Sequence, residues 1–156
     1  MTFRIFLAFD VEHDQDLCDG IRANSGTQGV FEVAATSRGG EITEPWKKKA
    51  REQISATDQF VVACSEHTAA SDHIAEEFRC AIEEEKPIVL LWSRREAMCT
   101  KPAGAKPTDV MYSWTPDILR EQLVANQRKS EQPKVPERLK HSASSPPSLM
   151  SPEDSS

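Results

Sequence analysis

The sequence predicts an α/β fold of the doubly wound type, a flavodoxin-like three-layer sandwich around a five-stranded parallel sheet. Within about 125 residues, a short apolar run, a polar turn and a segment of helical spacing follow one another five times. Three of the apolar runs show no alternation of polar and apolar residues, which is typical of strands covered on both faces. The chain has 156 residues, which is room for one such domain.

The apolar runs are the expected strands. They cover residues 4–9, 30–33, 59–64, 87–92 and 110–112. The three runs without alternation are expected at the centre of the sheet. Right-handed crossovers then bring the carboxyl ends of all the strands to one edge, where sites form in this class of fold.

Helical spacing and start signals predict the segments between the strands. The first helix, residues 14–22, is short. In the second, Pro45 stands in the first turn, and Trp46, Ala50 and Ile54 form one apolar stripe.

The third and fourth helices have polar caps in the sequence. Ser71 is expected to cap the third, whose buried face contains Ile74, Phe78, Ala81 and Ile82. The fourth begins at Thr115 and Pro116 and is expected to continue through Leu123.

Composition excludes several kinds of partner. Nineteen Lys and Arg residues stand against 25 Asp and Glu residues, so no domain-wide positive field favours nucleic acid. No apolar run reaches the ~20 residues of a membrane span, and no signal peptide is recognised, so a cytoplasmic protein with no membrane partner is expected. The four cysteines form no C-x-x-C pair, and reduced packing thiols are expected.

The chain changes character near residue 125. Residues 126–156 contain no aromatic side chain, and Ser and Pro recur in them. Such a segment buries too little apolar surface to offset its ordering entropy. We therefore expect an α/β domain over residues 1–125 and a disordered Ser/Pro-rich tail over residues 126–156.

The loops after the strands exclude three common activities of this fold. The acidic stretch 10–14 would repel the phosphate of a flavin, and no P-loop or G-x-G-x-x-G turn occurs. The third expected strand ends in Cys64, Ser65 and Glu66, without the acceptor Asp of a phospho-receiver.

His73 and Glu77 lie one turn apart on the third expected helix, with Glu77 at the flank of the apolar stripe. Glu77 is therefore a candidate catalytic carboxylate at the rim of the core. The alternatives are a solvated surface Glu, a surface ion pair with His73, or two ligands of a metal site without further partners. His13 is interpreted as a cap of the first helix, and His67 as lining the crevice or capping its loop.

Residues 65–78 read S-E-H-T-A-A-S-D-H-I-A-E-E-F and precede a K-P-I strand. This stretch resembles the TIR-like branch of the Toll/interleukin-1 receptor superfamily, which includes the TIR proteins of bacterial Thoeris anti-phage systems. The opening F-L-A-F of residues 6–9 and the pair Trp46 and Ile54 add to the resemblance. The chain departs from the family pattern at Ala8, His73 and Glu76.

The resemblance implies an enzyme that cleaves the nicotinamide N-glycosidic bond of NAD, with NAD as substrate, no cofactor and no metal. It implies Glu77 as the catalytic residue, and, if the chemistry is retained, His73 is expected to be its titratable partner. Phe9, Asp10, Arg38, Ser65, His67 and Ser71 are the expected binding residues. It further implies a homo-oligomer held by TIR-type contacts and an effector protein reached through a nucleotide signal.

Two other functions stay open at this point. The first is a non-catalytic TIR-like interaction module, favoured by the lost aromatic residues and by the Ser/Pro extension. The second is an enzyme resembling nucleoside deoxyribosyltransferases, which share the α/β layout and a carboxylate facing the ribose.

Overall fold

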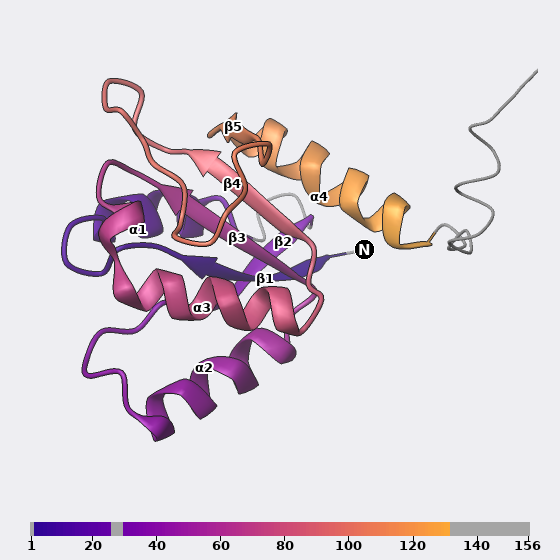
Figure 1. The fold of residues 1–156 in the computed structure, drawn as a ribbon. Helices are drawn as coiled ribbons and strands as arrows, with labels where there is room; N and C mark the ends of the chain where they lie inside the picture. Colours follow the sequence, from indigo (N-terminus) through magenta and orange to yellow (C-terminus); the bar gives the residue numbers. More distant parts are fainter. Residues whose placement is uncertain (1, 26–29, 132–156) are drawn as a thin grey trace, which may run out of the picture. The chain divides into compact units, whose positions relative to one another are not determined.

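Over the residues that the structure describes, five strands and four α-helices follow one another along the chain. The structure is a computed structural model and describes residues 2–25 and 30–131. In chain order the elements are β1 (Phe3–Ala8), α1 (Gln15–Ala23), β2 (Phe31–Thr36), α2 (Glu44–Ser55), β3 (Gln59–Cys64), the 3₁₀ turn η1 (Thr68–Ala70), α3 (Asp72–Glu83), β4 (Ile88–Trp92), β5 (Met111–Ser113) and α4 (Pro116–Glu131). The strands form one parallel sheet in the order β2-β1-β3-β4-β5 (Figure 1), and the predicted fold class is confirmed.

The strand side chains alternate between two apolar layers. Phe3, Ile5 and Leu7 of β1 pack with buried residues of α1 and α4. Phe6 and Ala8 pack with buried residues of α2 and α3. Every residue of β3 is buried, because helices cover both faces of the sheet. This explains the continuous apolar runs in the sequence and confirms the three-layer arrangement.

Hydroxyl caps begin three of the helices. The backbone N–H groups of Trp46, Ile74 and Ile118 donate to the side-chain oxygens of Thr43 at 3.3 Å, Ser71 at 3.2 Å and Thr115 at 3.0 Å. Each cap satisfies one N–H group that has no partner inside its helix and contributes about 1 kcal/mol. The start signals predicted at Ser71 and Thr115 are confirmed.

The end of α4 differs from the expectation. The helix runs to Glu131 instead of ending near Leu123, so residues 126–131 of the expected tail are helical. The Gln59 side chain explains part of this, since it donates to the Leu123 carbonyl at 2.8 Å and accepts from the Asn126 side chain at 3.0 Å. Residues 132–156, the rest of the expected tail, lie outside the described residues. The chain divides into two compact units after Asn126, and the sheet belongs to the first.

Two apolar side chains lie outside the core in spite of the expected pattern. Ile82 of α3 is 55% exposed, because Cys80 and Ala81 occupy the inner side of the last turn. Val110 is 57% exposed, and the last strand begins one residue later, at Met111.

Two expectations from composition concern the cysteines and membrane-spanning helices. All four cysteines are unpaired and buried, and burial raises the pKa of Cys64 to about 12, which keeps that thiol protonated. Over residues 2–25 and 30–131, no helix combines the length and apolar character needed to cross a membrane.

Candidate functional site

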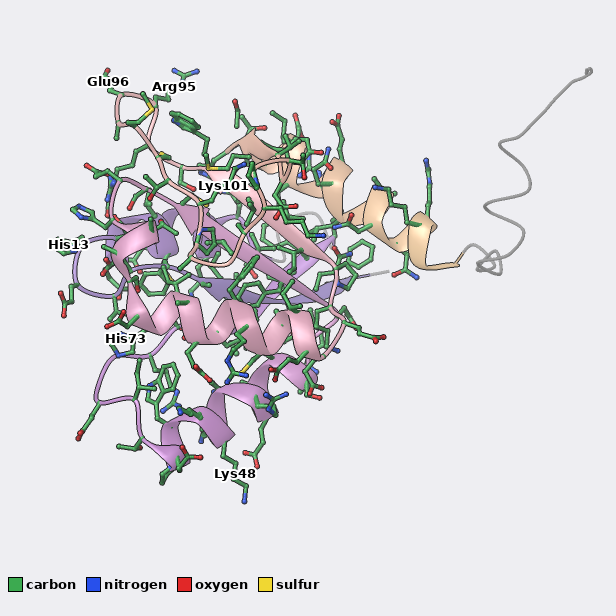
Figure 2. All side chains as sticks on the ribbon, viewed as in Figure 1. His13, Lys48, His73, Arg95, Glu96 and Lys101 are labelled. Carbon is green, nitrogen blue, oxygen red and sulfur yellow. The ribbon has the colours of Figure 1, made fainter. Side chains whose placement is uncertain are left out.

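Three loops meet at the carboxyl edge of the sheet, where the fold class places its sites. They follow β1, β2 and β3, and the first and third of them border a hollow of about 340 Å³. Its lining includes Asp10, His13, His67, Ser71 and His73. Figure 2 labels His13 and His73, which lie at the same end of the sheet, on the left in this view.

Glu77 is buried inside this edge, with 1% of its surface exposed. Its Oε1 accepts a hydrogen bond of 2.6 Å from the Ser37 hydroxyl, which follows β2 directly. The Ser37 oxygen in turn accepts from the backbone N–H of Phe9 at 3.0 Å, at the end of β1. A chain of hydrogen bonds therefore joins the ends of β1 and β2 to α3.

Burial determines the ionisation of Glu77. Loss of solvent raises its pKa from 4.5 to about 8, although the Ser37 hydroxyl, the Arg38 N–H and the Arg38 charge all act in the opposite direction. Glu77 is thus mostly protonated at neutral pH in this arrangement. The alternative that Glu77 is a solvated surface residue is wrong. Helical periodicity placed Glu77 at the flank of the apolar stripe, and the loop after β2 covers it there.

His73 makes a separate contact with the same loop. Its Nε2 lies 2.5 Å from the Gly40 carbonyl oxygen, and its ring meets the Trp46 ring edge-on at 5.4 Å between centroids. Glu77 hydrogen-bonds to Ser37 instead, so the two residues do not form the surface ion pair that their spacing allowed. Successive turns of α3 therefore hold the start of this loop, at Ser37, and its middle, at Gly40.

The loop between β2 and α2, residues 37–43, is also tied to α2. The Trp46 indole N–H donates to the Gly39 carbonyl at 3.2 Å. The Arg38 guanidinium lies 5.7 Å from the centroid of the Trp46 ring and donates to the Trp46 carbonyl at 3.4 Å. Gly40 has φ +98°, a conformation that glycine adopts without strain.

Asp10, His13 and His67 form a cluster at the border of the hollow. Asp10 Oδ1 accepts from the Glu12 backbone N–H at 2.9 Å, and its Oδ2 lies 3.4 Å from His13 Nδ1. The rings of His13 and His67 stack with centroids 3.9 Å apart. The interpretation of His13 as a helix cap is wrong: the residue before α1 is Asp14, and the His13 ring turns to Asp10 and His67.

The other predicted binding residues lie in different surroundings. Phe9 is 2% exposed and packs in the core beside α1 and α4. Ser65 is buried, and its hydroxyl donates to Asp14 Oδ2 at 2.5 Å. Ser71 caps α3 and borders the hollow. Four of the predicted site residues therefore line the hollow: Asp10, His67, Ser71 and His73. Arg38 lies in the loop after β2, and Glu77 contacts that loop. Phe9 and Ser65 are buried inside the protein.

The sequence did not predict individual roles for three residues at this edge, Ser37, Asp14 and Arg94. Ser37 holds Glu77, and Asp14, which is fully buried, pairs with Arg94 at 3.0 Å. Ser37 directly follows the end of β2, and Arg94 lies two residues after the end of β4, positions that signal a role in this fold class. Asp14 looks like an ordinary helix cap in the sequence, and no local pattern connects it to Arg94.

Comparison with known families gives one match. The family model described as the Thoeris protein ThsB, TIR-like domain, matches residues 6–97, which contain the last three residues of β1, all of β2 to β4 and every residue named above at the hollow. No curated protein matches the chain.

Proposed function

The chain belongs to the family of the Thoeris ThsB TIR-like domain and is a TIR-family signalling or defence protein; from this we propose that it processes NAD. The proposed reaction cleaves the bond between nicotinamide and its ribose. The products are nicotinamide and an ADP-ribose, linear or cyclic, that acts as a signal for an effector protein in anti-phage defence.

The observation that carries the proposal is the placement of Glu77, a buried carboxyl group at the carboxyl edge of the sheet with a hydroxyl and a backbone N–H as partners. Nicotinamide leaves with the electron pair of the C–N bond and becomes neutral, so the protein need not supply an acid. Positive charge develops on the ribose, and a nearby carboxylate stabilises it, as in glycosidases. Water, or a hydroxyl of the ADP-ribose itself, then attacks C1′ and releases a proton.

In this proposal the loop of residues 37–43 controls access to Glu77. In the structure, the Ser37 hydroxyl and the Arg38 backbone N–H hydrogen-bond to the Glu77 carboxyl group and so block it from a ligand. When the loop moves away, substrate hydroxyls replace Ser37 and solvent reaches the site. The pKa of Glu77 then falls toward its ordinary 4.5, and the group becomes the anion that the reaction needs.

The experiment incubates the purified full-length chain with NAD and measures free nicotinamide, in dilute solution and at concentrations that favour TIR-type assembly. Glu77→Gln is expected to abolish nicotinamide release. Glu76→Gln is the matched control, because Glu76 is the adjacent carboxylate on α3 and pairs with Arg79 on the surface. Absence of turnover in both the dilute and the assembled protein contradicts the proposal.

One observation favours a second function, a non-catalytic interaction module. The residues that line the hollow do not include Glu77, which is sealed below the surface. For such a module, Glu77→Gln leaves self-association and partner binding intact, and neither NAD nor a deoxynucleoside is consumed.

A further inference from the structure

Asp10, His13 and His67 are brought together by two loops that are far apart in the sequence. One ligand atom of each, an imidazole nitrogen or a carboxylate oxygen, lies within 4.8 Å of the others. We propose that these three residues bind a divalent transition-metal ion of the zinc class. The inference goes beyond the proposed NAD chemistry, which uses Glu77 and needs no metal.

The donor set fits such an ion. Two imidazoles and one carboxylate hold divalent zinc, iron and related metals and leave coordination positions for water. The three donors come from the loops after β1 and β3, and one ligand atom of each lies within 4.8 Å of the others, so the fold itself, and not a sequence motif, assembles them.

Neighbouring groups already orient the donors. The Glu12 N–H holds Asp10 Oδ1, which leaves Oδ2 to face His13. The His67 backbone N–H donates to the buried Ser65 hydroxyl at 3.0 Å, which fixes the start of the turn that carries His67. Such outer contacts are what metal sites use to position their ligands.

The histidine rings have room to adjust. They are nearly parallel, with an interplanar angle of 13°, and their nitrogens must turn toward one centre to share an ion. His13 is exposed and His67 half-buried, so rotation about their side-chain bonds meets little packing.

The charge of the hollow also favours a cation. Its lining carries the carboxylates of Asp10, Glu12 and Asp72, and none of the lining residues is a lysine or arginine. A divalent ion relieves this concentration of negative charge.

The experiment titrates untagged full-length protein, stripped of metal by chelation and dialysis, with Co²⁺ and then Zn²⁺ near pH 7.5. Calorimetry measures affinity and stoichiometry, and the visible absorption of Co²⁺ reports its coordination. We expect one equivalent to bind, and we expect Zn²⁺ to displace Co²⁺. Lowering the pH to about 5.5 is expected to weaken binding strongly, because protons compete for the imidazoles.

Variants separate this site from adventitious binding. His13→Gln and His67→Gln are each expected to lower affinity at least about 10-fold. His73→Gln is the matched control, because His73 borders the same hollow but contacts the Gly40 carbonyl, and its affinity is expected to stay at the wild-type value. Circular dichroism checks that each variant is folded.

Three results overturn the proposal: no binding, binding unaffected by loss of His13 and His67, or a near-ultraviolet Co²⁺–thiolate band that assigns the ion to cysteine. NAD is absent throughout, so these results leave the proposed cleavage reaction untouched. Likewise, absence of nicotinamide release in the NAD assay would contradict the proposed cleavage reaction but not the proposed metal site.

Discussion

Two buried carboxyl groups lie at the same edge of the sheet and differ in their partners. Asp14, on the α1 side, is 0% exposed and meets the Arg94 guanidinium at 3.0 Å and the Ser65 hydroxyl. Glu77, on the α2 and α3 side, is 1% exposed and meets the Ser37 hydroxyl, and among the described residues no guanidinium or ammonium group is in hydrogen-bond contact with it. A buried carboxylate paired with a cation serves a structural role with a constant charge. A buried carboxyl group without a cationic partner keeps its proton, and it can change charge when its surroundings change.

The largest expected difference concerns stability against pH. The folded-state pKa of Glu77 is raised, so the unfolded chain loses this proton near pH 4.5 and the folded chain only near pH 8. Glu77 therefore lowers the free energy of unfolding as pH rises through this window, by about 1.4 kcal/mol per unit and several kcal/mol in total. Urea unfolding at pH 5, 6, 7 and 8 measures this slope, and Glu77→Gln is expected to remove it. Equal slopes in both proteins would show that Glu77 ionises normally.

Next in size is the removal of the cation beside Asp14. Arg94→Met leaves a buried carboxylate without its charged partner, and we expect a loss of about 3 kcal/mol in the free energy of unfolding. Arg79→Met is the matched control, because Arg79 pairs with Glu76 and Glu83 on an exposed face, and its expected change is within about 0.5 kcal/mol. Equal losses in the two variants would mean that Asp14 and Arg94 are coupled no more strongly than a surface pair.

Ser37→Ala tests the partner of the other carboxyl group. The substitution leaves Glu77 and the Phe9 N–H without the hydroxyl, at an expected cost of about 1–2 kcal/mol. Because the Ser37 hydroxyl lowers the pKa of Glu77, that pKa is expected to rise in the variant. Carboxyl-carbon NMR of labelled glutamate measures it, and an unchanged or lower value contradicts the assignment.

The smallest expected effect is at Gly40. Its φ of +98° strains any residue with a Cβ, yet nothing lies within 4 Å of where that Cβ would be. Gly40→Ala is therefore expected to lose about 1 kcal/mol from backbone strain alone. Gly20→Ala is a suitable control, since its Cβ position is also open and Gly20 lies within α1. Thermal unfolding of the two variants measures the difference, and a Gly40→Ala protein as stable as the control would contradict the strain.

The sequence predicted the layers well and the site only in outline. Continuous apolar runs identify β1, β3 and β4 because covered strands need apolar side chains on both faces. Helical periodicity placed Glu77 near the core, but the bond that fixes its state comes from Ser37, in another loop. The extension of α4 depends on Gln59 in the same way. Such pairings depend on how segments that are distant in the sequence pack together, and local periodicity does not reveal them.

The single hydroxyl at Ser37 has a consequence for observing this protein. Its oxygen accepts from the main-chain amide of Phe9, and its hydrogen is donated to Glu77. When Glu77 ionises, its negative charge polarises the Ser37 hydroxyl and, through that hydroxyl, the Phe9 amide hydrogen, which is two hydrogen bonds away from the carboxylate. The chemical shift of the Phe9 amide, followed by NMR of ¹⁵N-labelled protein, therefore reports the ionisation of Glu77 without any ligand.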